Sequence, residues 1–490
     1  MPSAQNPAPT VVPALQTWTG GVGQLTIDAD LRVVSADPAL RAVANQVAAD
    51  LRDITGWRVP ITTKGERPGD LVLALDPEAV VGPDTAVAVG EGYRLEVTDR
   101  ARIAARTATG VFWGTRTALQ MLRRETPGCV SMPVGSTVDW PNYAVRGFMM
   151  DLGRRWFGPE QLSGYIRYMS WFKLNTFQLH LNDNAFKPKD GDDWSTVYSA
   201  FRLASDNPRF APMAATDGAL TRREWHRLED LAADHQVMLV PEIDAPAHAR
   251  AFIAFKPEIG LDGGNSDHLD LTNPEATSFM KEVFAEFVPW FRSPVVHVGA
   301  DEYPRAHAAE YKQYFNDITS YVRGLGKQPA AWGSFTMMSG GAAGYDRGVT
   351  INSWNNGWYD APQAIADGYP VINSNDALLY IVPFANYYHG QGLDGRWLYD
   401  SWEPHVFADG KNVPASHPLL RGAMSAVWND LVDAAYDGDD VHRLVEPSFG
   451  VLAHKMWRGA VQDLSYADFM ARVASLGTGP GTEKIDTPNL

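Results

Sequence analysis

The sequence has a single cysteine, no long apolar run and no excess of basic residues. Cys129 alone cannot form an internal disulfide, and no Cys/His cluster has zinc-finger spacing. No segment approaches the roughly 18 consecutive apolar residues of a membrane span. Lysine and arginine number 42 against 58 aspartate and glutamate, so the net charge is −16. Because a nucleic-acid binder needs a basic face, we expect no nucleic-acid partner and no membrane partner.

Aromatic residues are abundant in an otherwise ordinary globular composition. Hydrophobic residues make up 45% and charged residues 20% of the 490 positions, which is typical of a folded protein of two or three domains. The chain has 16 Trp, 18 Tyr and 20 Phe. Most such rings belong in a core, but this many tryptophans also leave flat rings for a ligand such as a sugar.

Residues 1–17 are polar and proline-rich, without a basic stretch followed by an apolar one, so they are not a signal peptide. We interpret them as a linker. A Pro/Ala-rich leader before the first strand fits a linker that follows a cleaved signal, and we therefore expect a secreted protein. A cytoplasmic protein is the alternative.

Residues 18–140 are predicted to form a small α+β domain. The apolar spacing predicts a helix over 38–56 that ends at Gly56, and a second helix over 110–124. Residues 25–36 alternate like a pair of strands, and a proline-containing stretch, 131–141, closes the domain. Further strands are expected at 70–75, 92–99 and 102–107.

Residues 141–480 alternate short apolar strands with amphipathic helices, among them helices at 159–172, 221–235 and 274–291. Eight strands are expected, at 146–151, 176–181, 237–244, 295–302, 329–333, 350–354, 370–373 and 422–428. Eight such units predict an α/β fold, a (β/α)8 TIM barrel, rather than an open doubly wound sheet. No Gly-rich phosphate loop follows the first strand. The segments 184–220 and 375–420 are too long for plain connectors, so we expect them to shape a substrate site.

Polar and aromatic residues close the predicted strands. In a TIM barrel the active site lies at the C-terminal strand ends. A polar residue at one strand end can simply cap a helix, but polar residues at many of the strand ends favour an active site. The residues at these ends are Asp151, Arg154, His180, Asp183, Glu242, Asp244, His248, Asp301, Glu302, Trp332, Trp354, Trp428 and Asp430.

The adjacent acids Asp301 and Glu302 are the sharpest feature of the sequence. Two neighbouring carboxylates repel, so their pKa values should separate, with one group ionised and one raised. Side chains of neighbouring strand residues point apart, so the pair is not expected to flank one bond at the ~5–5.5 Å of an ordinary retaining glycosidase. The sequence therefore favours a mechanism in which only one acid protonates a glycosidic oxygen.

Six motifs in order carry a family resemblance: RGFMMDLGRRWF, SWFKLNTFQLHLNDN, VPEIDAPAHA, HVGADEYP, AAWG and SAVWND. Together they resemble glycoside hydrolase family 20, the β-N-acetylhexosaminidases and lacto-N-biosidases. The resemblance runs from about Arg146 to Trp457, and the preceding α+β unit is similar to the small domain that accompanies this barrel.

This resemblance implies a retaining mechanism in which the substrate's acetamide oxygen attacks C1 and forms an oxazolinium ion. Glu302 would be the general acid and then the base, Asp301 would hold the acetamide N–H, and Tyr380 would donate a hydrogen bond to the acetamide oxygen. The other implied roles are walls of the sugar site (Trp332, Trp354 and Trp428), a charged shell behind Glu302 (His248 with Asp244), a contact to sugar hydroxyls (Arg154) and support of the site (Asp183). No cofactor and no metal is implied.

Two departures from the family pattern bear on the substrate. Hexosaminidases usually carry an acid two residues after the tyrosine and a glutamate two after the last tryptophan, where this chain has Val382 and Asp430. With Tyr388 eight residues after Tyr380, the arrangement resembles the lacto-N-biosidases, which release Gal-β-1,3-GlcNAc. The sequence favours that substrate, and Arg154, a hexosaminidase feature, favours release of a single N-acetylhexosamine. In either case the expected partner is an oligosaccharide or glycoconjugate with β-linked N-acetylhexosamine.

Two other classes stay open. One is a metal-dependent barrel hydrolase built on His180, Asp183, Asp244, His248 and Asp301, against which stands the lack of a His-x-His pair on the first strand. The other is a non-catalytic carbohydrate-binding barrel, against which stands the presence of both Asp301 and Glu302.

Overall fold

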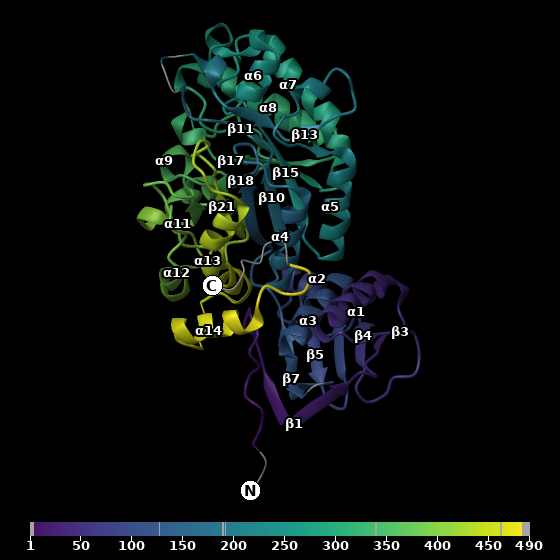
Figure 1. Ribbon diagram of the computed structural model, residues 1–490. Helices are drawn as coiled ribbons and strands as arrows, with labels where there is room; N and C mark the ends of the chain where they lie inside the picture. The colour runs from purple at the N-terminus through teal and green to yellow at the C-terminus, as the bar shows by residue number, and fades with distance from the viewer. Residues whose placement is uncertain are drawn as a thin grey trace.

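The computed structural model describes residues 4–126, 128–188, 191, 193–338, 341–460 and 463–482. Residues 1–3 of the predicted linker and residues 189, 190 and 192 of the long segment 184–220 lie outside the described residues. The chain forms a small N-terminal domain below a large barrel domain (Figure 1). None of the described helices has both the length and the apolar character that crossing a bilayer requires.

The N-terminal domain is one mixed sheet with helices packed on it. The strand order is β1-β8-β5-β6-β4-β2-β3, and β7 pairs with β8. The strands are β1 (Thr19–Asp28), β2 (Val33–Ser35), β3 (Ile61–Thr62), β4 (Leu71–Leu75), β5 (Tyr93–Val97), β6 (Ala101–Ala105), β7 (Arg123–Thr126) and β8 (Cys129–Asp139). The helices are α1 (Arg41–Thr55), α2 (Ala86–Glu91) and α3 (Ala108–Met121).

The structure confirms both predicted helices of this domain and changes two other predictions. Helix α1 ends before Gly56, which takes a left-handed conformation (φ 73°) that glycine adopts without strain. The strands predicted at 25–36 do not pair with one another: β1 pairs with β8, while β2 lies between β3 and β4. The reason is that β2 runs directly into α1, and a strand–helix crossover returns to a parallel neighbour. The closing stretch 131–141 falls mostly within β8, which binds β1, β5 and β7.

The second domain is a closed barrel of eight parallel strands, as predicted. The order is β19-β18-β17-β16-β15-β10-β9-β21, and pairing of β19 with β21 closes it. Every predicted strand is present: β9 (Val145–Asp151), β10 (Thr176–His180), β15 (Met238–Ala245), β16 (Val295–Gly299), β17 (Gln328–Trp332), β18 (Thr350–Ser353), β19 (Val371–Asn373) and β21 (Leu420–Val427). Strand β16 ends at Gly299, three residues earlier than predicted, which frees Asp301 and Glu302 from strand geometry.

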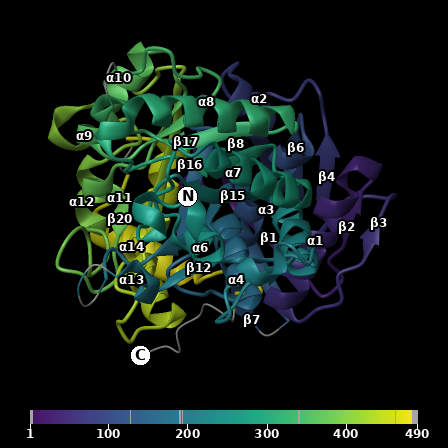
Figure 2. The ribbon, with the colours of Figure 1, turned by 90° about the horizontal axis from the view of Figure 1, so that it is seen from above.

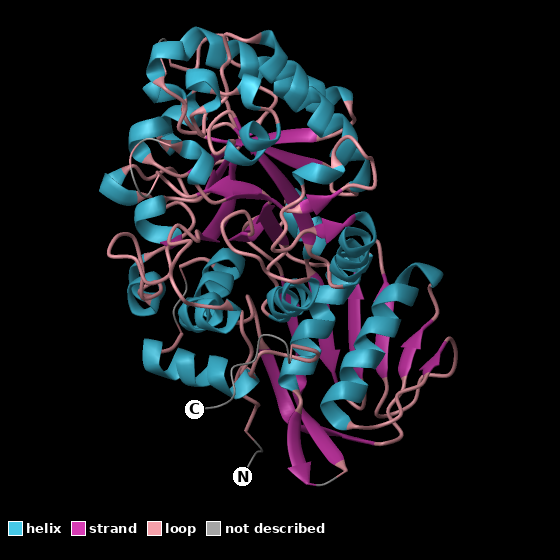
Figure 3. Cartoon of the chain, turned by 45° about the horizontal axis from the view of Figure 1, so that its top comes forward, coloured by secondary structure: helices cyan, strands magenta, loops and turns pink. Residues whose placement is uncertain are grey.

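Helices surround the barrel strands (Figures 2 and 3). The longer ones are α4 (Pro159–Trp171), α5 (Arg222–Asp234), α7 (Pro274–Phe287), α8 (Ala308–Gly324), α13 (Gly438–Arg458) and α14 (Tyr466–Leu476). The shorter ones are α6 (Arg250–Phe255), α9 (Asn356–Tyr359), α10 (Ala361–Ala366), α11 (Asp376–Leu379) and α12 (Gly395–Ser401). The long segment after β10 forms the short strands β11 (Asn182–Asn184), β12 (Ser199–Phe201), β13 (Leu203–Ala204) and β14 (Leu220–Thr221), and β20 (Tyr380–Ile381) extends beside β21.

Buried ion pairs join the two domains beneath the barrel. Arg146 at the start of β9 is fully buried, and its guanidinium lies 2.5 Å from the Glu91 carboxylate. Lys173 donates hydrogen bonds to the Tyr93 hydroxyl at 2.9 Å and to Asp139 at 3.0 Å. Because a buried charge is tolerated only when paired, these contacts fix the N-terminal domain against the first barrel strands, at the end remote from the strands' C-terminal ends.

Candidate active site

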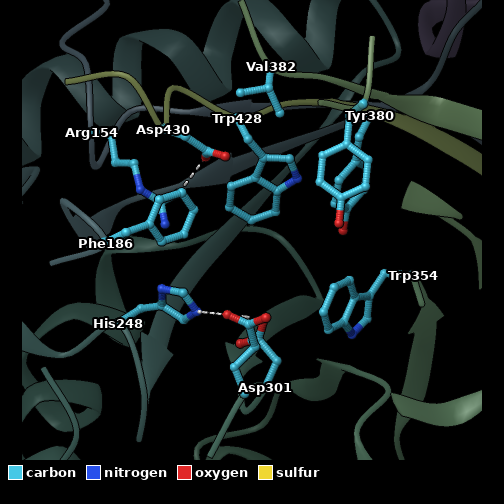
Figure 4. Close-up of a pocket in the computed structure, with 11 residues that line it drawn as sticks. Arg154, Phe186, His248, Asp301, Trp354, Tyr380, Val382, Trp428 and Asp430 are labelled. Carbon is cyan, nitrogen blue, oxygen red and sulfur yellow. Dashed lines mark ion pairs between the residues drawn. The ribbon is translucent and has the colours of Figure 1, made fainter. Parts of the chain in front are cut away.

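A pocket opens at the C-terminal ends of the barrel strands (Figure 4). Ten of the residues that line it are ones the sequence analysis singled out. The lining consists of Arg154, Phe186, His248, Asp301, Glu302, Trp354, Tyr380, Val382, Tyr388, Trp428 and Asp430. Three predicted site residues, Asp183, Asp244 and Trp332, do not line it and lie buried behind it.

Asp301 and Glu302 both approach one imidazole. Nε2 of His248 lies 3.3 Å from Oε2 of Glu302 and 3.9 Å from Oδ2 of Asp301. The expectation that the two side chains point apart is therefore wrong. The strand has ended, and Ala300 (φ 68°) and Glu302 (φ 52°) take left-handed conformations that break its alternation.

His248 is held from behind by Asp183. Nδ1 of His248 donates to Oδ1 of Asp183 at 3.0 Å, and Oδ2 of Asp183 accepts from Nε2 of His180 at 2.7 Å. Burial lowers the pKa of His248, but Asp183 and the two pocket acids outweigh burial, and the net pKa lies well above the usual value. His248 is thus a cation between Asp183 and the pocket acids. The partner predicted for it, Asp244, acts elsewhere.

Asp244 supports the loop that carries Asp301. Its Oδ1 accepts a hydrogen bond from the backbone N–H of Ala300 at 3.1 Å, and a side chain at Gly299 would collide with it. The hydroxyl of Tyr311 donates to the carbonyl of Ala300 from the other side. Burial, and next the charge of Asp301, raise the pKa of Asp244 well above its usual value. Asp244 therefore fixes the backbone turn that directs both pocket acids.

The pKa values of the two acids separate, as expected of adjacent carboxylates. Burial raises the pKa of Asp301 to about 6; His248 opposes this shift and Glu302 adds to it. Burial also raises the pKa of Glu302, but its hydrogen bond with His248 and that cation's charge outweigh burial, so the net pKa is lowered. Without a ligand, the proton therefore favours Asp301. Its buried Oδ1 has no hydrogen-bond partner among the described residues and can accept one from a ligand.

Arg154 places a permanent cation at one end of the pocket. Its guanidinium lies 2.7 Å from Asp183, 3.2 Å from Asp151 and 3.6 Å from Asp430. The ring of Phe186 covers it at 4.9 Å. Burial lowers the pKa of Arg154, but these carboxylates outweigh burial and hold it above the ordinary value. Such a fixed guanidinium with adjacent carboxylates is suited to binding sugar hydroxyls.

Aromatic rings form the opposite wall. The rings of Tyr380 and Trp428 lie 5.7 Å apart at 54°, and Trp354 lies beside Tyr380, on the side of the pocket away from Arg154 and His248 (Figure 4). The indole N–H of Trp354 donates to the carbonyl of Gly333 at 3.0 Å. Trp332, predicted as a third wall, is only 1% exposed and packs behind Trp428, with its indole N–H on Glu242 at 2.6 Å. It supports the wall and does not line it.

Sequence reasoning missed three residues around the pocket. Phe186, 52% exposed, lies over Arg154. The Tyr387 hydroxyl donates to Oδ2 of Asp430 at 3.0 Å, and the Tyr388 hydroxyl donates to the buried Asp376 at 3.0 Å. All three missed residues (Phe186, Tyr387 and Asp376) belong to the two long segments whose length predicted a role. Exposed aromatics within such segments were the available signal for Phe186 and Tyr387, whereas the buried Asp376 gave none.

Among the described residues, three clusters of acids and histidines could geometrically hold a metal. They are Asp151–His180–Asp183, His180–Glu242–Asp244 and Asp244–His248–Asp301, each with ligand atoms within 4.8 Å of one another. The donor set fits a cation poorly, because Arg154 already lies against Asp151 and Asp183, and His248 and His180 direct their ring nitrogens at these carboxylates. A metal would have to displace these charge pairs.

Comparisons with known proteins identify similar chains. The family model described as "Glycosyl hydrolase family 20, catalytic domain" matches residues 143–460, and that described as "Glycosyl hydrolase family 20, domain 2" matches residues 8–140.

Two curated relatives differ in how much of them the chain spans. The match to "Lacto-N-biosidase" of Bifidobacterium bifidum is 27% identical over 452 residues and covers 86% of this chain but 37% of that protein. The match to "Beta-N-acetylhexosaminidase" of Cellulomonas fimi is 26% identical over 485 residues, covering 94% of this chain and 92% of that protein. Further relatives named beta-hexosaminidase come from Porphyromonas gingivalis and Akkermansia muciniphila.

Solved structures share the fold over almost the whole chain. The β-N-acetylhexosaminidase of Streptomyces coelicolor A3(2) superposes with a TM-score of 0.79 at 23% identity, covering 99% of this chain and 98% of that one. At this identity the likeness bears on the fold, including the pairing of a small N-terminal domain with the barrel.

Proposed function

The chain belongs to glycosyl hydrolase family 20, and on this basis we propose that it is a retaining exo-β-N-acetylhexosaminidase in which the substrate's own acetamide is the nucleophile. The observation that carries the proposal is the approach of Asp301 and Glu302 to the single imidazole of His248, beside an aromatic pocket. This arrangement provides one acid for the leaving group and one acceptor for an amide N–H.

The first half of the reaction breaks the glycosidic bond. The acetamide N–H donates to Asp301 while the Tyr380 hydroxyl donates to the acetamide oxygen, which aims that oxygen at C1. The oxygen attacks C1, the bond from C1 to the leaving oxygen breaks, and Glu302 gives its proton to that oxygen. The rings of Trp354 and Trp428 exclude water from the oxazolinium ion.

The second half returns the enzyme to its starting state. Glu302, now a carboxylate, accepts a proton from water, and the water oxygen bonds to C1 on the face the leaving group vacated. The bond from C1 to the acetamide oxygen breaks, the acetamide is restored and the sugar leaves with retained configuration.

Binding of the sugar changes which acid holds the proton. An acetamide N–H bound to Asp301 favours its carboxylate form, which lowers its pKa from about 6. The sugar also covers Glu302, whose side chain is 40% exposed, and the loss of water raises the pKa of that acid. Binding therefore moves the preferred site of protonation from Asp301 to Glu302.

The pocket end at Arg154 supports release of a single N-acetylhexosamine. The guanidinium is held by three carboxylates and covered by Phe186, so it forms a rigid boundary for the sugar's outer edge. Most relatives are named as hexosaminidases. These observations support the alternative substrate of the sequence analysis better than the disaccharide that the sequence favoured.

A lacto-N-biosidase is the second candidate. Val382 and Tyr388 both line the pocket, and Val382 offers no acceptor to a terminal sugar's hydroxyls. The relative named lacto-N-biosidase is also the one with the higher identity of the two long matches described. A second sugar would then lie beyond the pocket, against Tyr388.

The experiment that tests the proposed activity compares two aryl glycosides that differ only at C2. The para-nitrophenyl β-glycoside of N-acetylglucosamine should be hydrolysed with the β anomer as first product, seen by NMR, and the corresponding glucoside should not. Equal turnover of both would show that the acetamide is not the nucleophile. Product analysis on lacto-N-tetraose separates the two candidate substrates, since a disaccharide product identifies a lacto-N-biosidase.

A further inference from the structure

Asp376 lies outside the pocket yet contacts three residues that line it. It begins helix α11 directly after β19, and it is only 5% exposed. Its backbone N–H donates to the carbonyl of Trp354 at 2.7 Å, and its carbonyl accepts from the backbone N–H of Tyr380. Its carboxylate Oδ2 accepts from the Tyr388 hydroxyl at 3.0 Å.

The same carboxylate also orders the segment behind Trp354. Oδ2 accepts a second hydrogen bond from the side-chain amide of Asn355 at 2.7 Å, and the amide oxygen of Asn355 caps helix α9 by accepting from the N–H groups of Gly357 and Trp358. Trp358 in turn stacks on Trp354, with ring centroids 6.2 Å apart. A single buried oxygen thus joins the segments after β18 and β19 to the segment that carries Tyr388.

Tyr388 needs such an anchor. Its side chain is on a long segment, it is 45% exposed, and its backbone takes a left-handed conformation (φ 47°) that costs free energy. Its ring nevertheless packs edge-on against Tyr380 at 5.7 Å. The bond to Asp376 is the polar contact that directs the ring over Tyr380 and keeps it from rotating into solvent.

We propose that Asp376 is a positioning residue that, through Tyr388, fixes the aromatic wall which receives the acetamide side of the sugar. The inference rests on the proposed function. It predicts a loss of catalysis without any contact between Asp376 and the substrate, because a small displacement of a wall residue misaligns the reacting oxygen.

The test is a double-mutant cycle on an aryl N-acetyl-β-glucosaminide. Asp376→Ala should lower kcat/KM by roughly 10- to 100-fold. Asp376→Asn should recover part of this loss, because the amide oxygen still accepts from Tyr388. Tyr388→Phe should lower kcat/KM less, and the double variant Asp376→Ala/Tyr388→Phe should be no worse than Asp376→Ala alone.

Asp360→Ala is the matched control. Asp360 lies at the start of another short helix as the N-cap of α10, and its side chain accepts from the N–H of Gln363 at 2.8 Å, but it does not line the pocket. Its variant should lower Tm and leave kcat/KM unchanged. If Asp376→Ala does not fold, the cycle is run with Asp376→Asn.

The inference would be overturned if the loss of kcat/KM in the double variant equalled the product of the losses in the two single variants. It would also be overturned if Asp376→Ala lowered Tm but kept full kcat/KM. An equal loss of kcat/KM in Asp360→Ala would do the same, because it would trace the effect to helix capping in general. Absence of turnover in the wild type is a different result, which refutes the proposed function itself.

Discussion

Nε2 of His248 lies 3.3 Å from Oε2 of Glu302. The same ring donates from Nδ1 to the fully buried Asp183, so its orientation is fixed and its positive charge is retained. This contact keeps Glu302 ionised in the free protein and allows it to become an acid only when a sugar displaces water. A general acid prepared in this way should be needed most where the leaving group is poor.

We predict that Glu302→Gln loses turnover in proportion to the basicity of the leaving group. General-acid catalysis is worth roughly 10²–10⁴-fold, so an oligosaccharide substrate should lose that much. An aryl glycoside with a nitrophenol leaving group, which departs without a proton, should lose far less. Rates on both substrates are the measurement, and equal losses would assign the acid role to another residue.

Asp301→Asn should stabilise the folded protein at neutral pH while cutting turnover strongly. Burial raises the pKa of Asp301 from 3.8 to about 6, so this group's contribution to stability is complete below pH ~4 and is lost as pH rises through 6. Asparagine carries no charge and avoids that loss, which is worth about 1–3 kcal/mol near pH 7.5.

Urea unfolding at pH 4.5 and pH 7.5 checks this second prediction. The stability gained by Asp301→Asn over wild type should grow between the two values. A gain that is the same at both, or that falls with pH, would show that Asp301 ionises as an ordinary carboxyl in the folded protein.

The substrate-assisted mechanism predicts a distinct inhibition pattern. A thiazoline analogue of N-acetylglucosamine mimics the oxazolinium ion, and ligands that resemble a transition state bind ~10²–10⁸-fold tighter than substrate. It should therefore inhibit strongly, and Asp301→Asn should weaken its binding. Labelling of a protein carboxylate by a 2-deoxy-2-fluoro glucoside, detected by mass spectrometry, would identify an enzyme nucleophile and refute the proposal.

Chelation should leave the activity unchanged. Arg154 already lies 2.7 Å from Asp183, so the acids behind the pocket are paired with a cation of the chain itself. Assays with and without EDTA on the aryl N-acetylglucosaminide test this. Loss of turnover that added divalent metal restores would revive the metal-dependent alternative.

Much of the fold and part of the site follow from the sequence because parallel strands bring their C-terminal ends together. Eight apolar strands with polar ends are therefore enough to predict that Arg154, His248 and Asp301 surround one pocket. The convergence of Asp301 and Glu302 on His248 does not follow, because the left-handed conformations at Ala300 and Glu302 leave no trace in hydrophobic periodicity. The roles of Phe186, Tyr387 and Asp376 could not be predicted for a related reason. These residues lie in long segments that have no helical or strand periodicity from which a position could be inferred. Secretion stays a prediction.

The last prediction concerns what lies at the sugar's outer edge. Val382 is fully buried beside the pocket and supplies no acceptor, while Arg154, Asp430 and Tyr387 form a connected set: the Tyr387 hydroxyl is bound to Asp430, which lies 3.6 Å from Arg154. A hydroxyl of a single terminal sugar can take the place of Tyr387 on Asp430, and a hydrogen bond to a charged group is worth about 1.5–3 kcal/mol.

We therefore expect para-nitrophenyl N-acetylglucosaminide to be cleaved with a higher kcat/KM than para-nitrophenyl lacto-N-bioside. Asp430→Asn should lower kcat/KM for the monosaccharide by about tenfold or more. Tyr388→Ala removes the ring that packs against Tyr380 and should lower kcat/KM for both substrates alike. The opposite preference, with Tyr388→Ala weakening cleavage of the lacto-N-bioside selectively, would show that a galactose stacks on Tyr388 and that the protein is a lacto-N-biosidase.

The preference of the enzyme for the monosaccharide should also depend on pH. Burial raises the pKa of Asp430 to about 6. Below that pH the carboxyl is protonated and accepts hydrogen bonds from the sugar less strongly, so the preference should weaken. Measuring both substrates at pH 5 and pH 7 on wild type and both variants separates the two outcomes.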